Sequence, residues 1–344
     1  MKIGIAIGGT LPDVSALAAE AEAAGLESVW LAELDRTAFV QAAAAVTATS
    51  NIGVGTAVAL AFPRSPTVTA MTAWDLDELS GDRFMLGLGA QVKRVLEARF
   101  SVKVDRPAPQ MAEYVRAVRT VWAANRGEAR VHEGERYRIT MPTFHGPLRL
   151  DRRDTPILVA GVGPVMSRVC GEVADGLLGH PMASPRYLGE AVAPRIAEGL
   201  ARAGRPGDAC TITAMALASI GDDAEAARRA ARLQIAFYAT TPSYKAILSL
   251  HGRADLPRDL RRAFVGHDRD RMAALIDDDL LDAIAVAGRP DEAVDRLAAW
   301  SGVADRVVLS VPWYGLTEGR VRESISAALE FGARLVGPRL PRAS

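Results

Sequence analysis

The sequence predicts an α/β barrel in which eight parallel strands alternate with eight helices. Short runs of apolar, β-branched residues alternate with longer runs rich in Ala, Leu and Glu along the whole chain. The short runs are almost continuously apolar, which is typical of parallel strands covered on both faces. Eight such strand–helix pairs fit a (β/α)8 or TIM barrel. A doubly wound open sheet is the alternative, but no Gly-rich phosphate turn follows the first strand.

Hydrophobic runs and helix boundary signals place each element in order. The first helix, for example, has Pro12 near its start and Gly25 at its end, and Gly81 closes the third helix. The expected strands are residues 2–7, 28–32, 52–60, 83–89, 156–160, 176–180, 210–218 and 306–312. The expected helices are residues 12–25, 38–49, 67–79, 111–124, 165–174, 185–203, 223–238 and 320–335.

Two segments exceed a minimal barrel. Residues 125–154 follow the fourth strand and include a hairpin-like stretch at 131–140, and residues 240–287 follow the seventh strand and read as mostly helical and charged. Long insertions in a barrel are commonly lids or walls of the active site. No internal repeat or linker divides the sequence, so we expect one domain over residues 1–344.

The composition argues against several classes of protein. The 41 Lys and Arg residues balance 41 Asp and Glu residues, whereas a general nucleic-acid binder needs a basic footprint. Cys170 and Cys210 form no Cys-x-x-Cys pair and the histidines have no ligand-like spacing, so we expect no metal site. Apolar runs are too short for a membrane span. We therefore expect a cytoplasmic protein that acts on a small molecule.

The turn after the fifth strand carries the clearest binding signal. The active site of a barrel lies at the carboxyl ends of its strands. There, Gly161-Val162-Gly163 runs directly into a helix, and such a turn lets backbone N–H groups and a helix start meet a phosphate. Arg168 lies about one turn into that helix. A plain tight turn has the same residues, so the pattern alone leaves both interpretations open.

Several other side chains follow the predicted strands. Glu33 ends the second strand and His180 ends the sixth, so both are candidate proton donors. For Glu33, a solvated loop carboxylate is the alternative. The expected pocket walls are Gln91 and Lys93 after the fourth strand, and Trp313 and Tyr314 after the eighth. Lys93 suits an anionic substrate or cofactor tail, whereas ordinary packing at the rim is the alternative for the two aromatic residues.

Stretches spread over nearly the whole chain carry a family signature. They are residues 1–5, 25–30, 61–66, 77–84, 87–89, 156–164, 172–176 and 284–292. Through them the chain resembles the bacterial luciferase-like superfamily, and within it the branch that uses the deazaflavin coenzyme F420. Arg64-Ser65-Pro66 and the end of the second insertion look most like the methylenetetrahydromethanopterin reductase-like enzymes.

The resemblance implies a deazaflavin that lies across the strand ends with its phosphate on the Gly161–Gly163 turn and Arg168 nearby. It also implies a non-prolyl cis peptide between Ala57 and Val58, behind the central ring of the cofactor. The cofactor-binding residues that follow from it are Glu33, Ala57, Val58, Gly89, Gly161, Val162, Gly163, Arg168 and His180.

One position departs from the family pattern. Many F420 relatives carry Asp-His at the end of the second strand, where the His takes part in proton transfer. This chain has Glu33-Leu34 instead. A hydride added to a double bond needs a proton on the partner atom, and the remaining candidate donors are Glu33, His180 and solvent.

Three functions remain open at this point. The first is an F420-dependent oxidoreductase that transfers a hydride to or from a C=C, C=N or alcohol/carbonyl group. The second is an FMN-dependent luciferase-like monooxygenase, and the third is a barrel that has lost both cofactor and catalysis. Relatives are mostly dimers, and the helix expected at 38–49 has almost no polar face. We therefore expect a homodimer, and a tolerated Ala-rich surface is the alternative interpretation of that helix.

Overall fold

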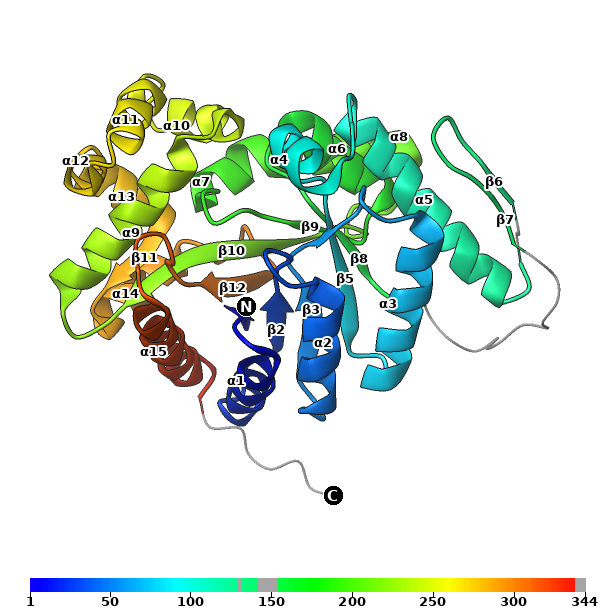
Figure 1. The fold of residues 1–344 in the computed structure, drawn as a ribbon, viewed down its shortest axis with the longest axis horizontal. Helices are drawn as coiled ribbons and strands as arrows, with labels where there is room; N and C mark the ends of the chain where they lie inside the picture. The colour runs from blue at the N-terminus through cyan, green and yellow to red at the C-terminus, as the bar shows by residue number, and fades with distance from the viewer. Residues whose placement is uncertain (129–130, 142–153, 338–344) are drawn as a thin grey trace.

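Eight parallel strands close into a barrel in the computed structural model, which describes residues 1–128, 131–141 and 154–337 (Figure 1). Around the barrel the strands follow one another in chain order, and β9 pairs with β10 to close the circle. The barrel strands are β1 (Lys2–Ile7), β2 (Ser28–Leu31), β3 (Gly53–Thr56), β5 (Phe84–Gly89), β8 (Ile157–Ala160), β9 (Gly176–Leu178), β10 (Thr211–Ile220) and β12 (Arg306–Ser310). The predicted fold class is therefore confirmed.

An outer layer of helices covers the strands (Figure 1). Their boundaries follow local signals: at α3, for example, the Ser65 hydroxyl caps the helix start by accepting from the Val68 N–H, and Gly81 ends the helix in the left-handed conformation. The covering helices are α1 (Leu11–Ala23), α2 (Ala38–Thr47), α3 (Pro66–Ser80), α5 (Pro107–Asn125), α6 (Pro164–Val173), α8 (Ala193–Ala203), α9 (Ala224–Ala239), α14 (Pro290–Ala298) and α15 (Glu318–Val336).

The inside of the barrel has its own apolar core, separate from the core between strands and helices. Trp30 fills one side of it, and its indole N–H donates to the Ser28 hydroxyl at 2.8 Å. The buried members of this inner core are Trp30, Met85, Leu158, Leu178, Met215 and Val308. Ala57, Val58 and Ala160 pack against it, so the inner core links the ends of several strands.

Several elements differ from the expectation, including α14 and a short helix at Lys93–Phe100, which were not predicted. The third strand is split into β3 and β4 (Ala59–Leu60), and the helix expected at 185–203 is divided into α7 (Pro185–Tyr187), a π-helical turn (Leu188–Val192) and α8. Pro194 explains the break between the π-helical turn and α8, because proline cannot donate the helical hydrogen bond. A ninth parallel strand, β11 (Ala285–Gly288), pairs with the far end of β10, where the sequence indicated the end of a helical insertion.

The two insertions lie at different edges of the barrel. The first begins with the predicted hairpin, β6 (Val131–Glu133) and β7 (Arg138–Thr140), while residues 129–130 and 142–153 lie outside the described residues. The second forms four short helices beside the strand ends (Figure 1): α10 (Lys245–Leu250), α11 (Leu256–Val265), α12 (Arg269–Ala274) and α13 (Asp278–Ile284). Within the described ranges, no helix has the length and apolarity needed to cross a bilayer.

Candidate active site

A bulge interrupts the pairing of β3 with β5 at the rim of the barrel. The register between the two strands shifts by one residue there, because Thr56, Ala57 and Val58 face only two residues of β5. The Thr56 hydroxyl replaces the missing backbone pairing: it donates to the Gly87 carbonyl at 2.7 Å and accepts from the Gly87 N–H at 2.9 Å. The peptide bond between Ala57 and Val58 is cis, as the resemblance implied.

Two glycines of β5 make room for this bulge. A Cβ atom at Gly87 would lie 1.8 Å from the carbonyl oxygen of Thr56, and one at Gly89 would lie 2.2 Å from the Val58 side chain. Ala57 and Val58 therefore rest directly on β5 and on the inner core, and they form a small apolar shelf above the strand ends.

Glu33 fixes the shelf from the neighbouring strand end. Its carboxylate accepts from the Leu60 N–H at 2.8 Å and from both terminal nitrogens of Arg64, and its backbone N–H donates to the Val58 carbonyl at 3.1 Å. The side chain of Glu33 is 6% exposed. Both carboxylate oxygens are therefore engaged by hydrogen bonds, and those to the guanidinium are charge-assisted. In this structure Glu33 therefore supports the shelf, and its predicted roles as proton donor and cofactor contact stay predictions.

The turn after β8 has the open geometry that the sequence predicted. The Val162 carbonyl accepts from the Tyr187 hydroxyl at 2.8 Å, and the Gly161 N–H donates to Leu178 on the next strand at 3.3 Å. Gly163 is the N-cap of α6, and in the described part of the chain no side chain caps this helix start. A Cβ atom at Gly163 would meet nothing within 4 Å. The first N–H groups of α6 are therefore free to meet an anion.

Arg168 does not face that helix start. Its guanidinium lies 3.3 Å from Glu198 of α8 and 3.7 Å from Glu172, one turn further along α6. The side chain thus points toward the carboxyl end of its helix and pairs with carboxylates there, and the predicted phosphate contact stays a prediction. The turn itself remains the candidate anion site.

His180 follows β9 and is enclosed by aromatic rings. Its Nδ1 accepts from the Met182 N–H at 3.1 Å, and its Nε2 lies 2.8 Å from the Tyr244 hydroxyl. The ring centroids of Tyr238 and Tyr244 lie 4.7 and 4.5 Å from that of the imidazole. Burial lowers the pKa of His180 to about 3, so the ring is neutral near pH 7. A proton on Nε2 satisfies both hydrogen bonds.

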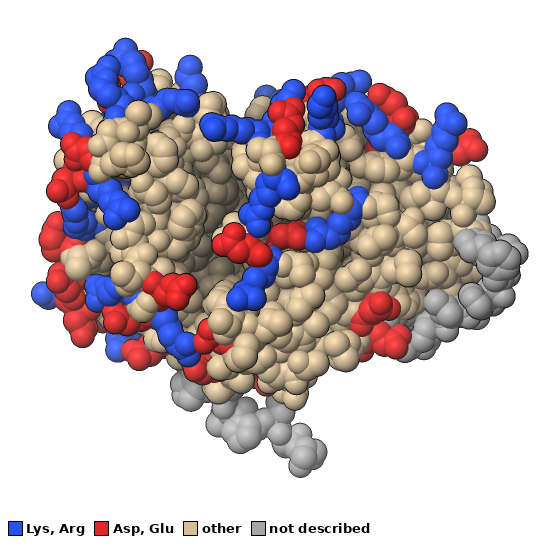
Figure 2. Space-filling view, in the orientation of Figure 1, with Lys and Arg blue, Asp and Glu red and all other residues tan. Residues whose placement is uncertain are grey.

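The aromatic residues after β12 line the same rim. The backbone N–H groups of Trp313 and Tyr314 both donate to the buried Gln234 side chain, at 2.9 and 2.8 Å. Tyr314 stacks on Phe237 of α9 with centroids 4.3 Å apart, whereas Trp313 is 42% exposed. Figure 2 shows a deep hollow between the side of the molecule that carries α11 and α12 and the side that carries α4 (Lys93–Phe100), with largely uncharged walls.

Gln91 and Lys93 lie at the start of α4. Gln91 has a positive φ of 58° and its side chain accepts from the Val92 N–H, so it stabilises its own turn. Lys93 is 62% exposed and lies 3.6 Å from Asp105 and 3.9 Å from Glu97. Both carboxylates compete with any anionic ligand for this ammonium group. The two pocket roles remain predictions.

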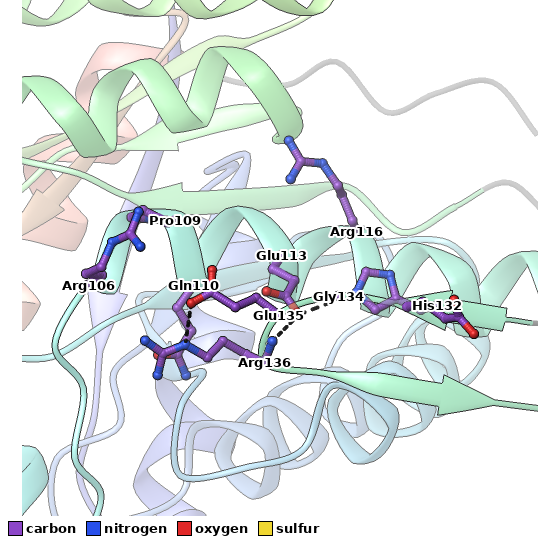
Figure 3. Close-up of a pocket in the computed structure, with 10 residues that line it drawn as sticks. Arg106, Pro109, Gln110, Glu113, Arg116, His132, Gly134, Glu135 and Arg136 are labelled. Atoms are coloured by element: carbon purple, nitrogen blue, oxygen red, sulfur yellow. Dashed lines mark hydrogen bonds and ion pairs between the residues drawn. The ribbon is translucent and has the colours of Figure 1, made fainter.

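A separate cavity of about 280 Å³ lies between α5 and the β6–β7 hairpin, away from the strand ends (Figure 3). Glu113 of α5 faces the hairpin and accepts from the backbone N–H groups of Arg136 and Tyr137 at 2.8 and 2.7 Å. These hydrogen bonds hold the hairpin against α5, and the cavity lies beside this contact. Among the described residues, no three His, Cys, Asp or Glu side chains are grouped so that they could hold a metal ion.

The structure adds three residues that sequence reasoning missed. Thr56 and Arg64 hold the shelf, and Tyr244 joins His180 from the second insertion. Arg64 belongs to a stretch that carries the family signature, but its partner Glu33 lies 31 positions away in sequence. No local pattern marks Tyr244, because its contact with His180 depends on how the insertion folds back.

Comparisons with known proteins agree with this architecture. The model of the luciferase-like monooxygenase family matches residues 4–306. "Uncharacterized protein Rv1360" of Mycobacterium tuberculosis is 40% identical over 314 residues, covering 87% of this chain and 91% of the relative. "Putative coenzyme F420-dependent oxidoreductase Rv3520c" of the same species is 30% identical over 333 residues, covering 90% of this chain and 94% of the relative.

Solved structures share the fold. The coenzyme F420-dependent tetrahydromethanopterin reductase of Methanopyrus kandleri has a TM-score of 0.79 at 23% identity, over 97% of both chains. The oxygenating constituent of 3,6-diketocamphane monooxygenase of Pseudomonas putida, in complex with FMN, has a TM-score of 0.68 at 17% identity, over 99% of both chains. Since the family model covers most of the sequence, this chain belongs to the luciferase-like monooxygenase family.

Proposed function

We propose that this protein is an F420-dependent oxidoreductase that transfers a hydride between the deazaflavin and a small organic substrate with a C=C, C=N or alcohol/carbonyl group. One observation carries the proposal: an apolar shelf and an uncapped helix start lie on the same rim of the barrel. The choice of F420 draws on the 30% identical relative that is named as an F420-dependent oxidoreductase.

The residues on this rim fit a cofactor with a flat ring system and a phosphate. Ala57 and Val58 offer an apolar surface against one face of a ring, and the two β5 glycines keep that surface in place. At the turn, Gly163 leaves open space, and no side chain of the described residues caps the start of α6. When bound, the deazaflavin supplies hydride chemistry. The chain's own residues support the ring, hold the phosphate and shield the reacting atoms from water.

An FMN-dependent monooxygenase is the second candidate, because one of the structures that share the fold contains FMN. The same shelf and turn suit either ring system. Deazaflavin has carbon in place of the flavin N5, which favours hydride transfer over reaction with oxygen. A barrel without any cofactor is the third possibility, and it predicts that neither compound binds.

Titration of the purified protein with oxidised F420 and, separately, with FMN tests the proposal through quenching of cofactor fluorescence. We expect tighter binding of F420. Tyr187→Phe removes the hydrogen bond to Val162 and is expected to weaken F420 binding several-fold. Tyr137→Phe is the matched control, since it removes a comparable hydrogen bond to Gln110 at the remote hairpin. Preference for FMN would support the monooxygenase, and binding of neither would support the cofactor-free barrel.

We also propose that the active species is a cytoplasmic homodimer. The outer faces of α2 and α3 expose apolar side chains that water disfavours, namely Val40, Val68, Met71 and Leu79. Cys170 and Cys210 are free and buried, which is typical of proteins from reducing compartments. Light scattering tests the dimer: Met71→Glu is expected to yield monomers, and an unchanged mass would place the interface elsewhere.

A further inference from the structure

Hydride transfer to a polar double bond leaves a negative charge that needs a proton, and the second strand end carries Leu34 where many relatives have His. Leu34 is 57% exposed and has no proton to give, and the Glu33 carboxylate is occupied by Arg64 and Leu60. We propose that the Tyr244 hydroxyl is the proton donor of the reaction and that His180 positions it. This inference rests on the proposed oxidoreductase function.

The hydrogen bonds around His180 fix the direction of the Tyr244 hydroxyl. Nδ1 of His180 accepts from the Met182 N–H, so the ring proton is on Nε2. That proton is donated to the Tyr244 oxygen at 2.8 Å. The tyrosine oxygen therefore acts as acceptor toward His180, and its own proton is left for a different partner.

The contact with His180 brings the Tyr244 hydroxyl to the strand ends of the barrel. Tyr244 ends the short 3₁₀ turn Pro242–Tyr244, which follows α9. The ring of Tyr244 packs on the ring of His180, with an angle of 31° between the two planes. His180 lies two residues beyond the end of β9. β9 pairs with β8, the strand that leads into the Gly161 turn, and Leu178 of β9 belongs to the inner core on which the shelf rests.

The surroundings keep the pair uncharged. Burial raises the pKa of Tyr244 above its ordinary value, and burial lowers that of His180. Tyr238 is the other titratable side chain in ring contact with the imidazole, and burial raises its pKa as well. At neutral pH all three groups are neutral, so Tyr244 carries the proton that the reaction requires.

The step balances with the reduced deazaflavin as hydride source. The substrate carbon gains a hydride, and a C–H bond forms while the π bond breaks. The electron pair of that π bond moves to the neighbouring oxygen, nitrogen or carbon atom, which takes the proton from Tyr244. The O–H bond of Tyr244 breaks, its phenolate oxygen is held by the N–H of His180, and solvent returns the proton. Alcohol oxidation is the same step in reverse.

The test compares Tyr244→Phe with wild type as the F420-loaded enzyme. Reduced F420 is mixed with probes for each bond type (2-cyclohexenone, a cyclic imine and cyclohexanone), and its reoxidation is followed by absorbance. With the best probe, we expect Tyr244→Phe to lower kcat at least about 100-fold, which is the usual contribution of a general acid. KM and the Kd of F420 are expected to stay within threefold.

His180 has its own readout, because a positioning residue is rescued by a side chain with the same hydrogen bonds. Gln carries an acceptor for Met182 and a donor for Tyr244, so His180→Gln is expected to keep kcat within tenfold, whereas His180→Ala approaches the loss seen with Tyr244→Phe. Far-ultraviolet circular dichroism and the F420 titration show whether each variant is folded.

Three other results would overturn the inference, at different levels. If wild type binds F420 and reduces a probe, and Tyr244→Phe does so at an equal rate, Tyr244 is not the donor while the proposed function stands. If loaded wild type reduces none of the probes, the oxidoreductase function fails and the inference fails with it. If KM and the Kd of F420 rose by as large a factor as kcat fell, the inference would also be contradicted, because such changes indicate a structural role for Tyr244.

Discussion

Two polar pairs on the barrel rim differ in whether they leave a hydrogen-bond donor free. Glu33 and Arg64 form a buried ion pair in which both carboxylate oxygens accept hydrogen bonds, and the pair also holds the backbone of Leu60. His180 and Tyr244 form a neutral pair in which the tyrosine proton is left over. A polar group with every bond satisfied stabilises structure, whereas a satisfied group that presents a spare proton is suited to chemistry.

The strongest test of this comparison concerns the shelf of Ala57 and Val58 that the ion pair supports. Gly87→Ala places a Cβ 1.8 Å from a backbone oxygen that cannot move without destroying the bulge. We expect it to lower the free energy of unfolding by at least about 3 kcal/mol, at the upper end of overpacking costs, or to prevent folding. Urea denaturation measures this effect.

Gly163→Ala is the matched control, because its Cβ meets nothing within 4 Å and its φ is negative. Its stability is expected to stay within about 0.5 kcal/mol of wild type, as for most surface substitutions. If both variants were equally stable, the shelf would not be a rigid part of the fold, and its role as a cofactor platform would lose its basis.

The ion pair itself comes next in size. Glu33→Gln leaves the mostly buried Arg64 guanidinium without a counter-charge, since Arg64 is 22% exposed. We expect a loss of about 2–3 kcal/mol in unfolding free energy, somewhat below the value for a fully buried broken pair. F420 affinity is expected to fall with it, because the side chain that ties Arg64 and the Leu60 N–H to the shelf loses its charge.

The opposite pattern would assign chemistry to Glu33. Full stability and unchanged F420 affinity, combined with a large loss of kcat, would make its carboxyl group the proton donor and would remove the distinction between the two pairs. Urea denaturation and the fluorescence titration on one sample of Glu33→Gln separate the two outcomes.

Most of the fold was accessible from the sequence because it depends on local signals. Buried parallel strands such as β1 are continuous apolar runs, and helix ends such as that of α3 carry a cap and a glycine. The prediction failed where tertiary contacts decide. β11 is a short Ala-Val-Ala-Gly run whose strand conformation depends on the extra length of β10.

The candidate site shows the same contrast between features set by local sequence and features set by tertiary contacts. The Gly161–Gly163 turn is contiguous, so its place at the start of a helix could be predicted, and the family resemblance correctly implied the cis peptide. The contact between Glu33 and Arg64 could not be predicted, because the two residues are distant in sequence. A residue type indicates which chemistry is available, but only the partners show whether its protons and lone pairs are already in use.

The neutral pair is tested by the pH dependence of stability. His180 has a pKa near 3 when folded and 6.5 when unfolded, so the unfolded chain binds the extra proton as the pH falls below 6.5. Stability is therefore fully present above pH 6.5 and is lost toward pH 3. Between pH 7 and pH 5 this group alone should cost about 2 kcal/mol.

His180→Gln has no such proton and is expected to lose about 2 kcal/mol less than wild type over this range, by the same linkage. Urea denaturation at pH 7, 6 and 5 gives the comparison. Burial also lowers the pKa of His251, but His251 is present in both proteins and cancels. Parallel pH profiles would mean that His180 titrates normally in the folded protein and is not enclosed.

The smallest effect on stability is expected for an exposed ion pair, which serves as the baseline for the Glu33–Arg64 and His180–Tyr244 pairs. Lys93 is 62% exposed and contacts Asp105 and Glu97 at 3.6 and 3.9 Å, distances at which solvent screens the attraction. Lys93→Gln is expected to change the free energy of unfolding by less than about 0.5 kcal/mol and to leave F420 affinity unchanged. A several-fold rise in KM confined to anionic probes would show that Lys93 leaves its carboxylate partners to meet substrate, and it would place a third polar group, one with an exchangeable partner, on the active rim.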